Sequence, residues 1–298
     1  MNQALHGVLP VLHMPYRDNY EIDFDTLQAE VDFAYECGAH GIVFALVSEV
    51  LRLTLEERRQ VAEFLVGANR NRGSVTISVG AESSFIAVQL ARHAESAGAT
   101  ALMAIPPVSV ALGEDQLRAY YGTILDAVSI PVVVQDASAY IGQPMSVEFQ
   151  ASLLAGHGER VHFKPEAAPV GPVITALKAA TQNRARIFEG SGGILLAENY
   201  RRGIEGTMPG TDLLDAVVAL WRALEAGDED WVYSISPLVG AILALAVGLD
   251  GYLALEKHLM VRRNIFKNEL VRGPVGFTLD AAARAEADRL FDRLQAVL

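Results

Sequence analysis

The chain has 298 residues, of which 51% are hydrophobic and 20% are charged, and this composition excludes a disordered protein while allowing one large domain. The formal net charge of −12 argues against nucleic acid or an anionic membrane as a partner. Cys37, the single cysteine, excludes an internal disulfide framework and suits a reducing compartment.

The N-terminal part of the chain begins without a targeting pattern. Met1–His6 has no basic segment followed by an apolar core, so we expect no signal peptide and a cytoplasmic location. Gly7–Leu12 predicts a first strand. Further along, Thr54 and Glu57 have the spacing of a capping box, which predicts that a helix begins there.

Short apolar runs alternate with helical patterns through most of the chain. The predicted strands are Gly7–Leu12, Gly41–Ala45, Val75–Val79, Ala101–Ile105, Pro131–Gln135, Val161–Lys164, Arg186–Phe188 and Gly206–Met208. They are apolar on both faces, which favours a parallel sheet covered by helices. Eight such units in about 225 residues predict an α/β fold of the (β/α)8 TIM-barrel type rather than an open doubly wound sheet. No strand is followed by a GxGxxG or GxxxxGK[ST] loop, so we expect no nucleotide cofactor.

The last part of the chain has helical patterns only, over about Asp230–Val247, Gly251–Phe266 and Leu279–Val297. We therefore expect a barrel over residues 1–227 and a C-terminal helical extension over residues 228–298. The most apolar run, Leu238–Leu249, is shorter than the ~20 residues that span a bilayer. We interpret it as a buried or subunit-contacting helix and expect no membrane association. Lys257 and the Arg262–Arg263 pair are interpreted as solvated or subunit-facing charges.

Lys164 is the residue around which a function can be argued. It ends a short apolar strand, and Pro165 after it stops the strand. Burying an unpaired ammonium costs roughly several kcal/mol, so one interpretation is a lysine that reaches water. The other is an amine kept neutral by apolar surroundings, ready to attack a carbonyl and form a Schiff base.

Four motifs bear on this choice: Gly7–Val11 with Met14–Tyr16, Ile22–Leu27, Leu53–Arg58 and Ala94–Ala99. They resemble the dihydrodipicolinate synthase/N-acetylneuraminate lyase superfamily of Schiff-base lyases over nearly the whole chain. In that family a lysine at the end of the sixth strand carries the substrate as an imine, and Lys164 falls at this position. The resemblance implies a small-molecule 2-keto acid as substrate and a homotetramer. We expect no cofactor.

The chain departs from the family in its substrate-binding loops. The GTTGE loop reads Ala45–Glu49 here, so the resemblance leaves carboxylate binding to the backbone N–H groups of Val47 and Ser48 and to the Ser48 hydroxyl. For Glu49 we favour holding its loop over contacting substrate. The YNxP motif after the fifth strand is replaced by Gln135–Ser138, and the arginine of the synthases by Tyr140. A true dihydrodipicolinate synthase is therefore not expected.

These replacements are similar to the L-2-keto-3-deoxyarabonate dehydratase branch of the superfamily. Ser48–Glu49, Gln135–Ala137 and Lys164–Glu166 are the matching segments, and Glu189–Gly193 and Gly206–Gly210 resemble its last two strand loops. The resemblance implies dehydration of a 2-keto-3-deoxy sugar acid, with Gly190 and Ser191 among the substrate contacts. Two alternatives stay open: a pyruvate-type aldolase that uses the same lysine, and a keto-acid-binding barrel that has lost catalysis.

Several site residues have two interpretations each. Glu166 lies two residues after Lys164 and therefore on the same side of an extended segment. It is interpreted either as a general base or as a solvated carboxylate. For Gln135 the interpretations are that it orients a water or hydroxyl, or that it stays in the barrel wall. For Tyr140 they are that it supplies the phenol of the missing proton-relay tyrosine, or that it packs at a subunit contact.

Two histidines are also open to a packing role. His13 ends the first strand, where its side chain either contacts the pocket or packs in the core. His162 lies on the same side of its strand as Lys164, and it either lowers the pKa of the lysine or fills a layer of the barrel. No His, Asp and Glu residues have metal-ligand spacing, so no metal site is predicted.

Overall fold

A computed structural model describes residues 5–298. Part of the Met1–His6 segment, for which we expect no signal peptide, lies outside the described residues. Strands and helices alternate, and the eight strands form one sheet in the order β1-β8-β7-β6-β5-β4-β3-β2. Further helices follow the eighth unit. This is a (β/α)8 barrel with a C-terminal helical extension, which confirms the predicted fold class.

The strands are short and buried. They are β1 (Gly7–Val8), β2 (Gly41–Phe44), β3 (Ser74–Ser78), β4 (Ala101–Ala104), β5 (Val132–Gln135), β6 (Val161–Lys164), β7 (Arg186–Glu189) and β8 (Gly206–Thr207). The α-helices are α1 (Phe24–Glu36), α2 (Leu55–Asn69), α3 (Ser84–Ala97), α4 (Glu114–Ala127), α5 (Val147–His157), α6 (Val170–Ala180), α7 (Leu196–Arg201), α8 (Leu214–Ala226), α9 (Glu229–Leu243), α10 (Gly248–Arg262) and α11 (Ala281–Val297). Two 3-10 turns complete the elements, η1 (Leu46–Ser48) and η2 (Gly158–Arg160).

A local sequence signal explains where α2 begins. Thr54 caps α2, and its amide donates to Glu57 Oε2 at 2.9 Å while the Glu57 amide donates back to the Thr54 hydroxyl at 3.2 Å. The predicted capping box is thus confirmed. The strand ending at Lys164 has the predicted bounds.

The apolar run Leu238–Leu249 is not one helix, contrary to the prediction. The first helix, α9, ends at Leu243, and α10 begins at Gly248. Gly248, the first residue of α10, has a φ of +68°, in the left-handed region that glycine adopts without a side-chain clash, so the preceding segment cannot enter α10 as a continuous helix. No single described helix is long and apolar enough to cross a membrane; only α9 and α10 taken together have that length and composition, and they are bent by 116°.

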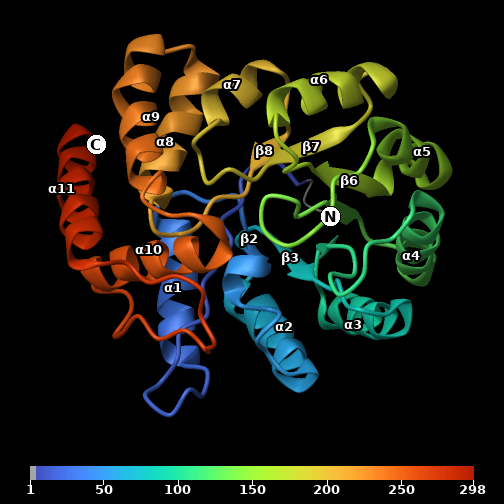
Figure 1. Ribbon diagram of the computed structural model, residues 1–298, viewed down its shortest axis with the longest axis horizontal. Helices are drawn as coiled ribbons and strands as arrows, with labels where there is room; N and C mark the ends of the chain where they lie inside the picture. Colours follow the sequence, from blue (N-terminus) through green and yellow to red (C-terminus); the bar gives the residue numbers. More distant parts are fainter. Residues whose placement is uncertain (1–4) are drawn as a thin grey trace. The chain divides into compact units, whose positions relative to one another are not determined.

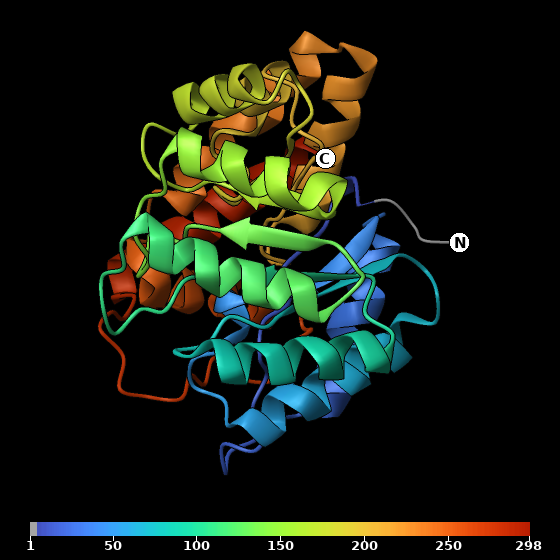
Figure 2. The ribbon, with the colours of Figure 1, turned by 90° about the vertical axis from the view of Figure 1, so that its right-hand side faces the viewer.

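The chain divides into two compact units. The first contains residues 54–190 and 198–206 together with residues 5–6, and so includes β3 to β7. Adjacent strands in it pair in parallel, and Gln135 of β5 stands in register with Lys164 of β6. Helices α2 to α6 pack one against the next along this unit, as Figure 1 shows for the series and Figure 2 for α3 and α4.

The second unit contains residues 7–53, 191–197 and 207–298. The backbone after β1 is bonded on two sides: the Leu9 amide donates to Thr207 O at 2.9 Å, and the Leu12 amide to Val43 O at 2.9 Å. Helices α8 and α9 pack together, and α11 packs on α9 and α10 (Figure 1). The segment after β1 is therefore held rigidly as it reaches His13.

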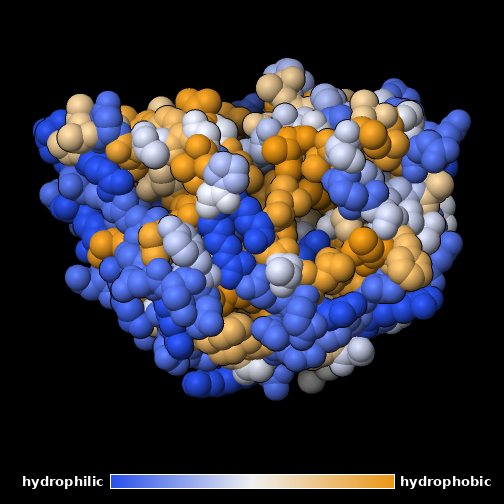
Figure 3. Space-filling view, turned by 60° about the horizontal axis from the view of Figure 1, so that its bottom comes forward, coloured by the Kyte–Doolittle hydropathy of each residue, from blue (hydrophilic) through white to orange (hydrophobic). Residues whose placement is uncertain are grey.

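The surface mixes charged and hydrophobic groups, as the face in Figure 3 shows. Among described residues, the most exposed large hydrophobic side chains are Val247, Phe85 and Tyr233, at 76%, 72% and 61% exposure. They lie far apart in the sequence, and single exposed apolar side chains are common on protein surfaces. They carry no functional assignment.

His162 lies in the interior of β6 and is 1% exposed. Its ring is tilted by 31° against Phe188 at a centroid distance of 5.9 Å, and its Nδ1 has no hydrogen-bond partner among the described residues. Burial, and then the charge of Arg186, lower the pKa of His162 from 6.5 to about 4. The imidazole therefore fills a layer of the core in its neutral form, and its folded and unfolded states differ in proton affinity.

We predict that His162 makes the fold less stable below neutral pH. Between pH 6.5 and about 4 the unfolded chain binds a proton at this residue and the folded chain does not, so the free energy of unfolding falls as the pH falls. The contribution reaches about 3 kcal/mol at the acid end of that window. Urea unfolding of wild type and His162→Gln at several pH values measures it, and equal pH slopes for the two proteins would contradict it.

Candidate active site

The Lys164 side chain is buried at the end of β6. It is only 5% exposed, so the interpretation as a lysine that reaches water is wrong. Its Nζ lies 2.9 Å from Oε1 of Glu166, whose side chain is 3% exposed. An ammonium in the interior needs such a partner, because burying it alone is costly. The amine and the carboxylate thus form one buried pair.

Gln135 and Asp136 position the carboxylate of that pair. The Gln135 side-chain amide donates to both Glu166 oxygens at 3.1 Å, which follows from the register of β5 with β6. The Asp136 carboxylate accepts the backbone N–H of Glu166 at 3.1 Å and that of Ala167 at 3.3 Å. Ser138 in turn donates to Asp136 Oδ1 from its amide at 3.0 Å and its hydroxyl at 2.9 Å. The turn after Lys164 is thereby fixed by side chains of the preceding loop.

Gly190, directly after β7, leaves room for the lysine. A Cβ at this position would lie 2.5 Å from Lys164 Cε, 2.9 Å from Lys164 Nζ and 2.8 Å from Glu166 Oε1. These distances are far shorter than van der Waals contacts, so a larger residue would displace the amine. The resemblance selected Gly190 as a substrate contact; the structure places it against the lysine itself.

Glu166 is suited to exchange a proton with its neighbour. Burial raises the pKa of Glu166 above its ordinary value of 4.5, although the Lys164 charge and hydrogen bond oppose the shift. A carboxylate with a raised pKa accepts a proton more readily than an exposed one, and its Oε1 is within hydrogen-bond reach of Nζ. Gln135 Oε1 is buried without a partner among the described residues, which leaves one further acceptor in the same group.

Two tyrosines of this unit contact the end of β5 or the turn after it. Tyr140 is half-buried in the turn after β5, and its amide donates to Ala137 O at 3.0 Å. Tyr121 is fully buried, with its hydroxyl 3.4 Å from Ala104 O and 3.5 Å from Gln135 O. Burial, and next the neighbouring Tyr120, raise the pKa of Tyr121 well above 10. The proton-relay role for Tyr140 stays a prediction.

The loop after β2, in the second unit, is held by its own hydrogen bonds. The Ser48 amide donates to Ala45 O at 3.0 Å, its hydroxyl donates to Leu12 O, and the Ala45 amide donates to that hydroxyl at 3.1 Å. Val47 is half-buried at the centre of the turn. The predicted carboxylate contacts from Val47 and Ser48 stay predictions. In the other loop, Ser191 Oγ accepts the Leu195 amide at 2.9 Å.

Glu49 and Lys257 form a second buried pair, and the interpretation of Lys257 as a solvated charge is wrong. Lys257 is 0% exposed, and its ammonium donates to the Glu49 carboxylate and to the carbonyls of Met14 and Leu270. Glu49 Oε2 also accepts the Arg272 amide at 3.1 Å. A helical pattern cannot reveal such burial, because the partner carboxylate is more than 200 residues away in the sequence. The pair ties the loop after β2 to α10 and the segment that follows it.

His13 is fully buried in the second unit, with both ring nitrogens in contact with carboxylates. The sequence offered either a pocket or a packing role for it and gave no sign of these partners. Asp136 was also missed as a positioning residue. It belongs to a motif that the sequence analysis quoted, but only the backbone path of the next loop brings Glu166 and Ala167 to its carboxylate.

Comparison with known proteins gives one family. Residues 4–290 match the Dihydrodipicolinate synthetase family. The 4-hydroxy-tetrahydrodipicolinate synthase of Rhizobium meliloti (strain 1021) is 29% identical over 184 residues, 61% of this chain, and the match spans 58% of that synthase's own length. The L-2-keto-3-deoxyarabonate dehydratase of Azospirillum brasilense is 26% identical over 233 residues, covering 76% of this chain and 75% of that protein.

The fold comparison agrees. The crystal structure of a dihydrodipicolinate synthase from Rhodopseudomonas palustris superposes with a TM-score of 0.85 at 25% identity, covering 97% of this chain and 98% of the other. The match extends over nearly the whole of both chains, so the helices after the eighth strand are part of the shared architecture.

We predict that Glu49 and Lys257 are coupled in stability. Lys257→Met leaves the Glu49 carboxylate buried without its cation and is expected to cost about 3–5 kcal/mol of unfolding free energy. The double variant Glu49→Gln/Lys257→Met removes both charges, so its cost should be smaller than the sum of the single costs. Urea unfolding measures all three. Arg289→Met, which breaks an ion pair with side chains 64% and 44% exposed, is the control and should change little. Additive single costs would contradict the coupling.

Proposed function

The chain belongs to the Dihydrodipicolinate synthetase family, and from that premise we propose that it is a Schiff-base lyase that dehydrates a 2-keto-3-deoxy sugar acid. The observation that carries the proposal is the buried contact of 2.9 Å between Lys164 Nζ and Glu166 Oε1. The likeness to the L-2-keto-3-deoxyarabonate dehydratase supports the choice of substrate class. The cytoplasmic location stays a prediction from the N-terminal sequence, and the homotetramer stays a prediction from the resemblance.

The first step of the proposed reaction is formation of the imine. Glu166 takes a proton from the Lys164 ammonium, and the neutral amine attacks C2 of the 2-keto acid. The proton held by Glu166 then goes to the C2 hydroxyl of the carbinolamine, which leaves as water. A protonated imine on Lys164 remains, with Glu166 ionised again and still held by the Gln135 amide.

The second step uses the iminium as an electron sink. Glu166 removes a proton from C3, the electron pair of the C3–H bond forms the C2=C3 double bond of an enamine, and the C2=N pair moves to the nitrogen. The enamine pair then moves to C3–C4 as the C4 hydroxyl leaves, and the proton on Glu166 goes to that hydroxyl to give water. A proton then leaves C5 and one is added at C3, and the resulting C4=C5 enol takes up a proton at C4 as its hydroxyl loses one, which gives the C5 carbonyl. Water hydrolyses the remaining imine and frees the lysine. The net change is the loss of one water from the substrate.

The alternative fates of the same imine differ in the bond that breaks. In an aldolase, the C4 hydroxyl loses its proton as C3–C4 cleaves, the aldehyde leaves, and pyruvate stays on the lysine as its enamine until protonation and hydrolysis release it. Glu166 lies beside the nitrogen bonded to C2, a position that favours proton transfer at the neighbouring C3 over proton removal from the more distant C4 hydroxyl. We also propose that the enzyme lacks dihydrodipicolinate synthase activity, because Gln135 stands at the position of the proton-relay tyrosine of the YNxP motif.

The proposal predicts the products of a direct assay. Incubation with L-2-keto-3-deoxyarabonate and its stereoisomers should yield a semialdehyde or 2,5-dioxo acid, detected by mass spectrometry, with no release of pyruvate. Lys164→Arg should lose turnover by at least about 10³-fold, because arginine keeps the charge but forms no imine. Release of pyruvate would identify an aldolase, and full activity of the arginine variant would overturn the proposed imine.

Glu166→Gln separates the proton transfer by Glu166 from its contact with Lys164. The variant keeps the size of the side chain but cannot take a proton, so kcat should fall by about 10²–10⁴-fold while KM changes less. In wild type, kcat/KM should fall as the pH drops through the pKa of Glu166, which burial places above 4.5, and this acid limb should be absent from the residual activity of the variant. Lys178→Met, on the outer helix α6, is a control that should leave both parameters unchanged. An unaltered kcat in Glu166→Gln would contradict the assigned base.

A further inference from the structure

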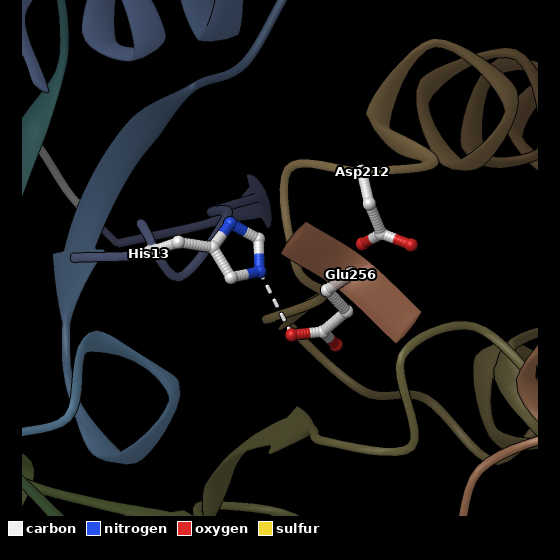
Figure 4. A group of neighbouring side chains, drawn as sticks. All are labelled: His13, Asp212 and Glu256. Atoms are coloured by element: carbon white, nitrogen blue, oxygen red, sulfur yellow. Dashed lines mark hydrogen bonds and ion pairs between the residues drawn. The ribbon is translucent and has the colours of Figure 1, made fainter. Parts of the chain in front are cut away.

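One imidazole and two carboxylates meet inside the second unit, and none of the three takes part in the reaction proposed above. His13 follows β1, Asp212 follows β8, and Glu256 lies on α10 (Figure 4). One ligand atom from each lies within 4.8 Å of the other two, and all three residues are buried. The three are far apart in the sequence, which is why their spacing predicted no metal site.

The His13 ring is held in one orientation. Its backbone amide donates to Glu30 Oε1 at 2.9 Å, and its Nδ1 lies 2.9 Å from the same oxygen and 2.8 Å from Thr211 Oγ1. The other nitrogen, Nε2, faces Glu256 Oε2 at 2.8 Å. A carboxylate on Nδ1 is the usual partner of a histidine that binds a metal through Nε2, because it fixes the tautomer and the ring plane.

Asp212 supplies an acceptor that nothing in the described part of the chain satisfies. The residue is 2% exposed, and its Oδ2 is buried without a hydrogen-bond partner among described residues. Its other oxygen and Glu256 Oε1 both face Gly210, where a Cβ would lie 2.6 and 3.0 Å from them. The glycine thus lets two carboxylates approach each other in the interior. A buried acceptor of this kind needs a hydrogen-bond donor or a cation, and two carboxylates so close together favour a cation.

The charge of the cluster points the same way. Glu30, Asp212 and Glu256 surround a single imidazole, and Arg263 binds the backbone oxygen of Asp212 while its guanidinium pairs with Asp215. Three carboxylates therefore surround one imidazole here, an excess of acceptors that a bound cation would relieve.

A second histidine of the same unit shows what a neutralised cluster looks like. His258 lies 2.9 Å from Glu269 Oε1 and 3.0 Å from Asp288 Oδ1. Arginines offset those acids: Arg284 contacts Glu269 at 2.7 Å, and Arg262 contacts Asp288 at 3.1 Å. This cluster is half-buried and has cations of its own, so it serves as a matched control.

We propose that His13 Nε2 and one carboxylate oxygen each from Asp212 and Glu256 bind one divalent cation of the Zn²⁺ or Mn²⁺ class. One imidazole nitrogen with two carboxylate oxygens suits these borderline cations. Metal–ligand bonds of about 2.0–2.2 Å need the ligand atoms somewhat closer than 4.8 Å, so a small rotation of the Asp212 carboxylate completes the site. The cation takes the place of the proton between Nε2 and Glu256.

Such a cation would join three parts of the second unit. It links the segment after β1, the segment after β8 and helix α10, so binding contributes directly to the stability of this unit. Three protein ligands leave a coordination position for water. The proposal does not depend on the lysine chemistry, since none of its residues takes part in it.

Titration of the chelator-treated, dialysed full-length protein with Zn²⁺ tests the site, with Mn²⁺ and Mg²⁺ in parallel. Calorimetry should give one Zn²⁺ per chain, the melting temperature should rise with Zn²⁺ concentration, and Mg²⁺ should bind more weakly. Asp212→Asn keeps the shape and relieves the charge repulsion, so it should fold and yet lose at least about tenfold in affinity. Glu256→Gln is the second variant and should behave alike.

Asp288→Asn in the His258 cluster should bind Zn²⁺ as wild type does. Circular dichroism of each metal-free variant checks its fold. The proposal is overturned if wild type takes up no Zn²⁺, or if Asp212→Asn and Glu256→Gln both keep wild-type affinity, since binding would then occur at surface histidines.

Discussion

The Lys164 amine and the Glu166 carboxylate form a buried charged pair, and the neighbouring strand ends of the first unit are arranged to hold it. Each ion would be costly to bury alone, and their mutual attraction offsets that cost only with good geometry and further hydrogen bonds. The protein supplies both. Gln135 donates to both carboxylate oxygens, Asp136 holds the Glu166 backbone, and Gly190 leaves the space that the amine occupies. Each of these contributions comes from the end of a neighbouring strand or the loop after it.

The same pair connects stability with chemistry. A carboxylate whose pKa is raised by burial is a better proton acceptor than one in water, and the nearest donor is the amine that must become neutral to attack a ketone. In the proposed reaction, the raised pKa that burial gives Glu166 lets it take the proton of Lys164. The second unit keeps a comparable pair, Lys257 with Glu49, but there three further backbone groups contact the two charges and hold them in place.

Much of this could be predicted from the sequence. The alternation of apolar runs with helical patterns predicts the eight units, and the strand that ends at Lys164 followed by proline marks the lysine. The position of Glu166 follows from the alternation of side chains in an extended segment. Contacts between distant segments could not be predicted. They are the burial of Lys257, the hydrogen bonds of Asp136 to the backbone of the loop after β6, and the close approach of His13, Asp212 and Glu256. Local patterns carry no signal for them, because each depends on how the closed sheet brings remote loops together. The break between α9 and α10 was also missed, because the run around Gly248 is apolar throughout and its hydrophobic pattern does not change at the break.

The most direct test of the central claim is to locate the covalent adduct. The protein is incubated with pyruvate and reduced with borohydride, and the modified peptide is then identified by mass spectrometry. The account predicts one reduced pyruvate per chain, carried by Lys164, and a sharply lower yield for Gly190→Ala, in which the added methyl group displaces the amine, than for the control Gly67→Ala, whose added methyl group meets no neighbour. An adduct on another lysine, or none with any 2-keto acid, would contradict it.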